Sequence, residues 1–200
     1  MEAMDFFRMS AGKWRSQRTT HHLAFRRAEQ GGSEIYVEPL PADDARVVAI
    51  CQMHEVDASL SIGGAYVKWD GTMAWDKEDE THSGETVFAL VPDTAAEANP
   101  EQPQGGRLLR ERGYAEIVPV VGRYYVDADN ALVLTTDYST MSSIERFWFP
   151  EPDVRIRMSG VQSFGGYSTA TFCTEVRITD APLSTDPIPA AAAVTSVFGW

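Results

Sequence analysis

Hydrophobic and polar residues alternate along most of this chain, in short segments that turn residues separate. A period of two residues is typical of β-strands, whose successive side chains point to opposite faces. The alternation is clearest in two neighbouring segments, 142–149 (SSIERFWF) and 154–159 (VRIRMS). In the second segment Arg155, Arg157 and Ser159 share one face, and the apolar residues share the other. Which way these arginines face decides what the protein can bind.

About ten such segments predict an all-β fold, a closed up-and-down antiparallel barrel. One or two short helices are expected to accompany it, over residues 3–11 and after the turn residues 41–44. Asp70-Gly71 is typical of a tight turn, so the segments on either side of it are expected to form a hairpin with Trp69 and Trp75 on opposite faces. The expected strands are 13–23, 31–40, 65–69, 72–76, 86–91, 107–114, 117–126, 132–138, 145–149, 154–163 and 168–178.

The length of 200 residues suits a single barrel domain. We expect this domain to span 1–180 and to be followed by a flexible tail, 181–200, which is rich in Pro and Ala. Residues 92–104 are expected to form a loop. The chain has no long apolar run and no secretory signal at its start, so we expect a cytoplasmic protein that does not span a membrane.

The formal net charge of −12 argues against nucleic acid and anionic membranes as partners. The basic residues are 14 arginines and 3 lysines, a bias that favours recognition of carboxylate or phosphate groups. The two cysteines, Cys51 and Cys173, stand outside any metal-binding pattern and are expected to be buried and reduced. No metal site is expected at His21-His22, because no ligand stands at a suitable spacing.

Three arginines, Arg18, Arg155 and Arg157, are candidates for an anion clamp inside the barrel. The alternative is that they lie outside or pair with internal carboxylates. Glu145 could hydrogen-bond or protonate a nitrogenous ligand, or it could form a salt bridge with one of these arginines. If Glu145 points inward, its neighbour Arg146 must point outward, and Trp148 shares that outward face. Trp69 and Trp75 could stack on a flat conjugated ligand or simply pack in the core.

Several strings of this sequence resemble the S-type phycobiliprotein lyases. The resemblance covers roughly residues 4–179 and is strongest in SAGKW (10–14), SQRT (16–19), HHL (21–23), WDGTM (69–73), WD (75–76), MSS (141–143), ER (145–146), FGG (164–166) and STA (168–170).

This resemblance implies a lipocalin-like barrel that binds an open-chain tetrapyrrole, a phycobilin such as phycoerythrobilin or phycocyanobilin. It implies that the protein promotes thioether formation between the ethylidene group of the pigment and a cysteine of an apo-phycobiliprotein subunit. The protein would act chiefly by binding and positioning the pigment. The main alternative is a non-catalytic carrier of a bilin or another hydrophobic carboxylate. No prosthetic group is expected, a homodimer remains open, and a plastid stroma would replace the cytoplasm if the source is an alga.

The family's site residues also map onto this sequence. The resemblance gives catalytic roles to Glu145 and Arg155, with Glu145 near the pyrrole nitrogens. It implies that the remaining pigment contacts are Arg18, Trp69, Trp75, Arg146, Arg157 and Ser159, among which arginines would hold the two propionates.

Overall fold

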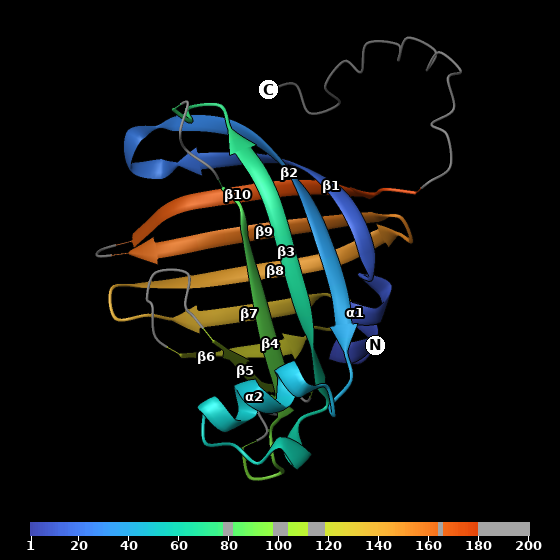
Figure 1. The fold of residues 1–200 in the computed structure, drawn as a ribbon. Coiled ribbons are helices and arrows are strands. Elements are labelled where there is room, and N and C mark those ends of the chain that lie inside the picture. Colours follow the sequence, from blue (N-terminus) through green and yellow to red (C-terminus); the bar gives the residue numbers. More distant parts are fainter. Residues whose placement is uncertain (78–81, 98–103, 112–118, 164–165, 180–200) are drawn as a thin grey trace.

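The protein is a closed antiparallel barrel of ten strands (Figure 1). The computed structural model describes residues 1–77, 82–97, 104–111, 119–163 and 166–179. Neighbouring strands in the sequence pair with each other, and β10 closes the barrel against β1. The strands are β1 (Gly12–His22), β2 (Arg27–Leu40), β3 (Gly63–Met73), β4 (Gly84–Pro92), β5 (Gly105–Arg110), β6 (Val120–Val126), β7 (Leu132–Asp137), β8 (Met141–Glu151), β9 (Val154–Ser163) and β10 (Gly166–Arg177).

Helix α1 (Ala3–Met9) closes one end of the barrel. A capping box between Glu2 and Asp5 fixes its first turn. Its buried side chains include Phe6 and Phe7, which pack into the main hydrophobic core. The core residues that surround them belong to β3–β8, among them Phe88, Leu108, Tyr124, Leu132 and Phe147. This end of the barrel is therefore filled by side chains.

Helix α2 (Ala45–Met53) packs against the outside of the barrel. Asp44 caps it, because its carboxylate accepts a hydrogen bond of 2.8 Å from the backbone N–H of Arg46. Val47 and Ile50 form a second core with outward residues of β4 and β5, including Ala89 and Leu109. No helix among the described residues is long and apolar enough to cross a membrane.

The predicted barrel and both short helices are confirmed, but the predicted hairpin at Asp70-Gly71 is wrong. These two residues continue β3 without a break and pair with Glu34 and Ser33 of β2. A Cβ on Gly71 would lie 2.9 Å from the backbone oxygen of Gly32. The glycine therefore allows two strands to approach closely, and it does not form a turn.

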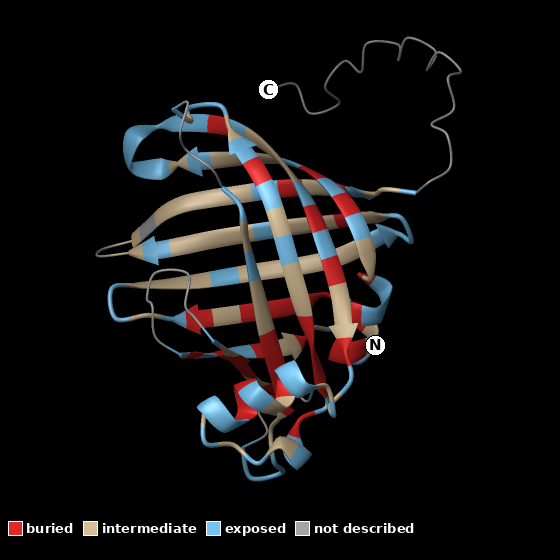
Figure 2. Ribbon diagram, viewed as in Figure 1, coloured by how far each residue is buried: buried red, intermediate tan, exposed pale blue. Residues whose placement is uncertain are grey.

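Burial differs between the two sides of the barrel. Buried residues concentrate around α1 and in β4–β7, whereas β8, β9 and much of β10 are of intermediate exposure (Figure 2). The inward side chains of β8 and β9 include Glu145 and Arg157, which are 26% and 23% exposed. Solvent thus reaches the lumen along these strands. The predicted tail, 181–200, and part of the predicted loop, 92–104, lie outside the described residues.

Candidate functional site

The lumen is polar where β1, β10, β9 and β8 meet. Residues that pair across neighbouring strands share a face, so the strand register places the inward side chains in rows at successive depths. The deepest row contains Ser16, Glu175 and Arg155. The next contains Arg18, Cys173, Arg157 and Phe147, and the third contains Thr20, Thr171, Ser159 and Glu145. His22 and Thr169 pair at the open end.

Arg155 is committed to an internal partner. It is 5% exposed, and its Nε donates a 2.5 Å hydrogen bond to Oε2 of Glu175, which is 0% exposed. Its guanidinium also lies 4.8 Å from the ring centre of Trp14. Burial lowers the pKa of Arg155, and the carboxylate of Glu175 opposes that effect. The structure therefore places Arg155 at the floor of the lumen, in the internal ion pair that was the alternative to a clamp.

The row above holds two guanidiniums with poor hydrogen-bond acceptors. Arg157 Nη2 donates to Cys173 Sγ at 3.4 Å, and Arg18 Nε donates to Met73 Sδ at 2.9 Å. Thiol and thioether sulfur atoms are weak acceptors. In the described part of the chain Arg18 forms no ion pair. Both groups would gain from a carboxylate ligand in place of sulfur.

Arg157 has carboxylates nearby but no hydrogen bond to them. Glu145 Oε1 is 3.7 Å from Nη1, and Glu175 Oε1 is 3.8 Å from Nε. Arg157 Nε and Glu175 Oε1 are buried atoms without a hydrogen-bond partner. Burial alone lowers the pKa of Arg157, but Cys173 and the two carboxylates outweigh it, so the pKa is raised. The cation is stabilised, and its donors remain available.

Glu145 and Ser159 face each other directly. They are register partners on β8 and β9, one row nearer to the open end than Arg157. Glu145 points inward, and its loose ion pair with Arg157 is one of the two roles considered for it. A ligand that binds in this row would meet one carboxylate and one hydroxyl.

Trp69 lies on the opposite wall and faces the lumen. It packs with Trp14, Ile35 and Phe149. Its register partner is Gly84, and a Cβ at that position would lie 2.5 Å from Cζ2 of the indole. Gly84 therefore provides the space in which the Trp69 ring lies.

The open end of the barrel carries Trp75, which follows β3. This side chain is 51% exposed and stacks on His22, with ring centroids 5.3 Å apart. His22, Trp75, Phe25 and Arg27 line a hollow of about 510 Å³. The structure thus separates Trp75 at the mouth from Trp69 deeper inside.

Arg146 does not lie with the other predicted site residues. It points to the outside of β8, because its neighbour Glu145 points inward. Its Nε donates to Asp127 at 2.8 Å, its Nη2 donates to Asp129 at 3.0 Å, and its guanidinium covers the ring of Trp148. The prediction that Arg146 contacts the pigment is corrected by this outward, paired position.

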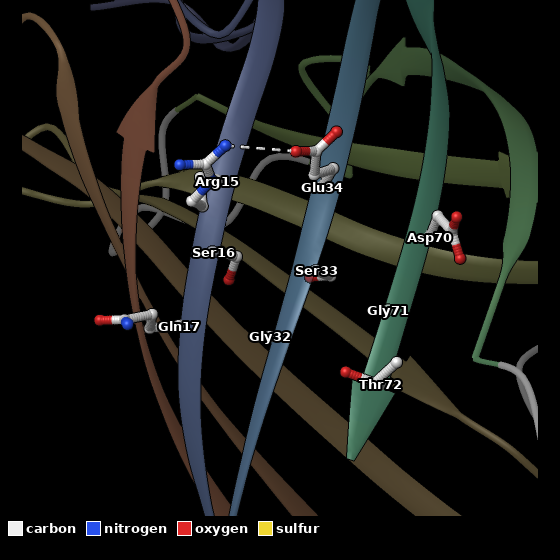
Figure 3. A pocket seen from close by; sticks show the side chains of 9 residues that line it. All are labelled: Arg15, Ser16, Gln17, Gly32, Ser33, Glu34, Asp70, Gly71 and Thr72. Carbon is white, nitrogen blue, oxygen red and sulfur yellow. Dashed lines mark hydrogen bonds and ion pairs between the residues drawn. The ribbon is translucent and has the colours of Figure 1, made fainter. Parts of the chain in front are cut away.

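A second hollow, of about 380 Å³, runs along the wall formed by β1, β2 and β3 (Figure 3). Exposed polar side chains line it, including Gln17, Asp70 and the pair Arg15–Glu34, whose atoms lie 3.5 Å apart. Such a lining suits water better than a large apolar molecule. The lumen is the better candidate site.

Sequence reasoning missed Glu175 and Cys173 as parts of the lumen, and it missed Glu29, which hydrogen-bonds to His22 at the open end at 3.1 Å. Glu175 and Cys173 alternate with Thr171 on β10, so the period-two pattern could have put all three on one face. Their side of the barrel could not be read, because a bulge between Tyr167 and Thr169 shifts the register by one residue. Glu29 lies in a part of β2 that was not predicted as a strand.

Comparison with known proteins shows the family to which the chain belongs. Residues 2–178 match the family model described as "CpeS-like protein". The chain belongs to the CpeS-like family. Every lumen residue described above falls within the matched range, so the assignment covers the whole candidate site.

Three CpeS-like relatives show how closely the chain follows the family. It is 62% identical to "Chromophore lyase CpcS/CpeS 2" of Synechocystis sp. over 95% of this chain and 96% of the relative. It is 55% identical to "Phycocyanobilin lyase subunit CpcS" of Picosynechococcus sp. over 100% and 98%. The solved structure of the S-type phycobiliprotein lyase CPES from Guillardia theta has a TM-score of 0.74 and 32% identity, with 90% of this chain and 94% of that chain covered.

Proposed function

We propose that this protein is a bilin lyase, which binds an open-chain tetrapyrrole in its lumen and promotes its thioether attachment to a cysteine of an apo-phycobiliprotein subunit. The relatives named above as chromophore and phycocyanobilin lyases support this proposal. One structural observation carries it: Arg18 and Arg157 lie in one row of a solvent-accessible lumen, and each donates to a sulfur atom. A dianionic pigment would replace both weak acceptors.

The chemistry of a bilin fits the rows of the lumen. The two propionates would bind Arg18 and Arg157, whose guanidiniums flank Cys173. The pyrrole nitrogens would then lie in the row of Glu145 and Ser159, where a carboxylate can accept or share their protons. The conjugated body would stack on the indole of Trp69. Arg155 acts indirectly in this arrangement, because its pair with Glu175 fixes the floor beneath Arg157.

The lyase would act mainly by positioning the pigment. A pigment fixed at both propionates has one orientation in the barrel, so its reactive end is presented at the mouth near Trp75. Such positioning converts an encounter of two flexible reactants into an effectively unimolecular step. The site requires no resident cofactor for this chemistry, since the addition of a thiol to an ethylidene group is redox-neutral.

Phycocyanobilin is the pigment that we propose first, because a relative of 55% identity carries it in its name. We expect the reaction to take place in the cytoplasm. Cys51 and Cys173 are both buried and unpaired, as in proteins of reducing compartments.

The test combines the protein, phycocyanobilin and an apo-phycobiliprotein subunit, and measures covalently bound pigment after acid denaturation. We expect the protein to raise both the rate and the yield of a single thioether product. Tight pigment binding without any gain in attachment would show a carrier instead. No pigment binding at all would exclude both functions.

A further inference from the structure

The mouth of the barrel contains a histidine whose partner is a buried carboxylate. His22 is the last residue of β1 and lies on the inward face with Arg18 and Thr20. Its Nε2 is 3.1 Å from Oε2 of Glu29, which is 7% exposed. The other carboxylate oxygen of Glu29 accepts the backbone N–H of Trp75 at 3.0 Å. Both oxygens of Glu29 are therefore engaged, and the carboxylate is fixed in place.

This contact favours one tautomer of the neutral imidazole. An ionised carboxylate can only accept hydrogen bonds, so the hydrogen between the two groups belongs to Nε2. In the neutral ring Nδ1 then carries a free lone pair. In the described part of the chain, Nδ1 has no hydrogen-bond partner. The Trp75 ring stacks on the imidazole at an interplanar angle of 25° and holds its orientation.

The hollow beside His22 leaves room for a protein ligand. The hollow of about 510 Å³ that His22 lines also has Phe25, Arg27 and Trp75 in its wall. Phe25 is 75% exposed and Leu23 is 44% exposed, which is typical of a rim that a partner covers. An acceptor cysteine must arrive at this end, because α1 and its core fill the other.

We propose that His22 is the general base that deprotonates the acceptor thiol, with Glu29 as its positioning residue. The inference rests on the proposed bilin lyase function. A cysteine thiol with a pKa of about 8.5 is mostly protonated at neutral pH, whereas the thiolate is the nucleophile. A base beside the incoming thiol takes up its proton and so forms the reactive thiolate at neutral pH.

The step is balanced in atoms and electrons. His22 Nδ1 takes the thiol proton as the sulfur forms its bond to the ethylidene carbon. The electron pair of the carbon–carbon double bond moves to the adjacent ring carbon. That carbon takes up the proton from the imidazolium, directly or through a water molecule that passes it on, and His22 returns to its neutral form. The net change is the addition of S–H across one double bond, without oxidation or reduction.

The charged groups around His22 come from three strands. On β2 these are Glu29 and Arg27, of which Arg27 is its register partner. On β1, Arg18 lies four residues away on the same face, and β10 contributes the uncharged Thr169. After β3, the carboxylate of Asp76 is bound by His82 and by the backbone of Met73.

The test compares His22→Gln and Glu29→Gln with His21→Gln, a neighbouring residue that points outward. Bilin affinity is measured by absorbance titration, and single-turnover attachment to the apo-subunit is measured at pH 7.0 and pH 8.5. A general base contributes about 10²–10⁴-fold, so we expect His22→Gln to slow attachment by about 100-fold at pH 7.0 with bilin affinity unchanged. Glu29→Gln should slow it by a smaller factor, and His21→Gln should leave it unchanged.

The pH dependence separates a base from a structural role. Without its base, the His22→Gln variant depends on acceptor thiolate that forms in solution. The fraction of this thiolate rises by about tenfold from pH 7.0 to pH 8.5. We therefore expect the ratio of the attachment rates of the wild type and His22→Gln to fall by about tenfold at pH 8.5. Three results would overturn the inference. The ratio of the two rates could be the same at both pH values, His22→Gln could attach the pigment at the normal rate, or a loss of bilin affinity could account for its slower rate. Absence of attachment by the wild type would instead overturn the proposed function, and the inference with it.

Discussion

The buried pair of Arg155 and Glu175 gives the sharpest prediction for the barrel itself. Arg155→Met keeps a long side chain against Trp14 but removes the charge that faces Glu175. The carboxylate is 0% exposed, and its nearest remaining cation is Arg157 Nε at 3.8 Å. Loss of one partner of a buried ion pair costs about 3–5 kcal/mol. At about 2–4 °C per kcal/mol for a domain of this size, Tm should fall by about 6–20 °C.

Urea unfolding, followed by tryptophan fluorescence, measures this loss. The double variant Arg155→Met/Glu175→Leu should recover most of it, because a buried pair replaced by apolar residues is often neutral or stabilising. The control is Arg15→Met, which breaks an exposed pair with Glu34 and should cost well under about 1 kcal/mol. A cost below about 1 kcal/mol for Arg155→Met, or a double variant as unstable as the sum of the singles, would refute the reasoning.

Two further changes probe the lumen and the hydrophobic core. Gly84→Ala should lower bilin affinity and shift the tryptophan emission, because its Cβ would lie 2.5 Å from the Trp69 indole; Gly32→Ala, whose Cβ meets nothing nearer than 3.6 Å, should do neither. Burial raises the pKa of Tyr124 to about 12 from 10.0. The folded-state value is the higher one, so this stabilisation is complete below pH 10 and is lost as the pH rises towards 12. Between pH 9 and pH 11 the wild type should therefore lose about 1–2 kcal/mol more free energy of unfolding than Tyr124→Phe. Equal losses would contradict this.

The alternation of polar and apolar residues was sufficient to predict the barrel and most of its strands. It also placed Arg155, Arg157 and Ser159 on one face of their strand. It could not show that Glu145 shares this face, because the register between β8 and β9 shifts by one residue between Trp148 and Glu151. It failed at Asp70-Gly71, because a glycine that permits close strand contact looks the same in the sequence as one that forms a turn.

The partner of Arg155 could not be predicted for a different reason. Glu175 pairs with Arg155 only because of the bulge between Tyr167 and Thr169. With a regular register, Glu175 would pair with Val154 and face outward. A one-residue shift of this kind leaves no local signal in the sequence. The contact between His22 and Glu29 likewise depends on the pairing of β1 with β2, beyond the predicted start of that strand.

The most direct measurement compares binding of phycocyanobilin with that of its dimethyl ester, for the wild type and for Arg18→Gln. Arg18 forms no hydrogen-bonded ion pair in the described part of the chain and only helps, from a distance, to lower the pKa of Asp76, so its removal should affect folding little. A charged hydrogen bond contributes about 1.5–3 kcal/mol, so we predict that the wild type prefers the free acid by at least about tenfold and that the variant loses much of this preference. Equal affinity of the wild type for acid and ester would contradict a lumen that holds the pigment by its propionates.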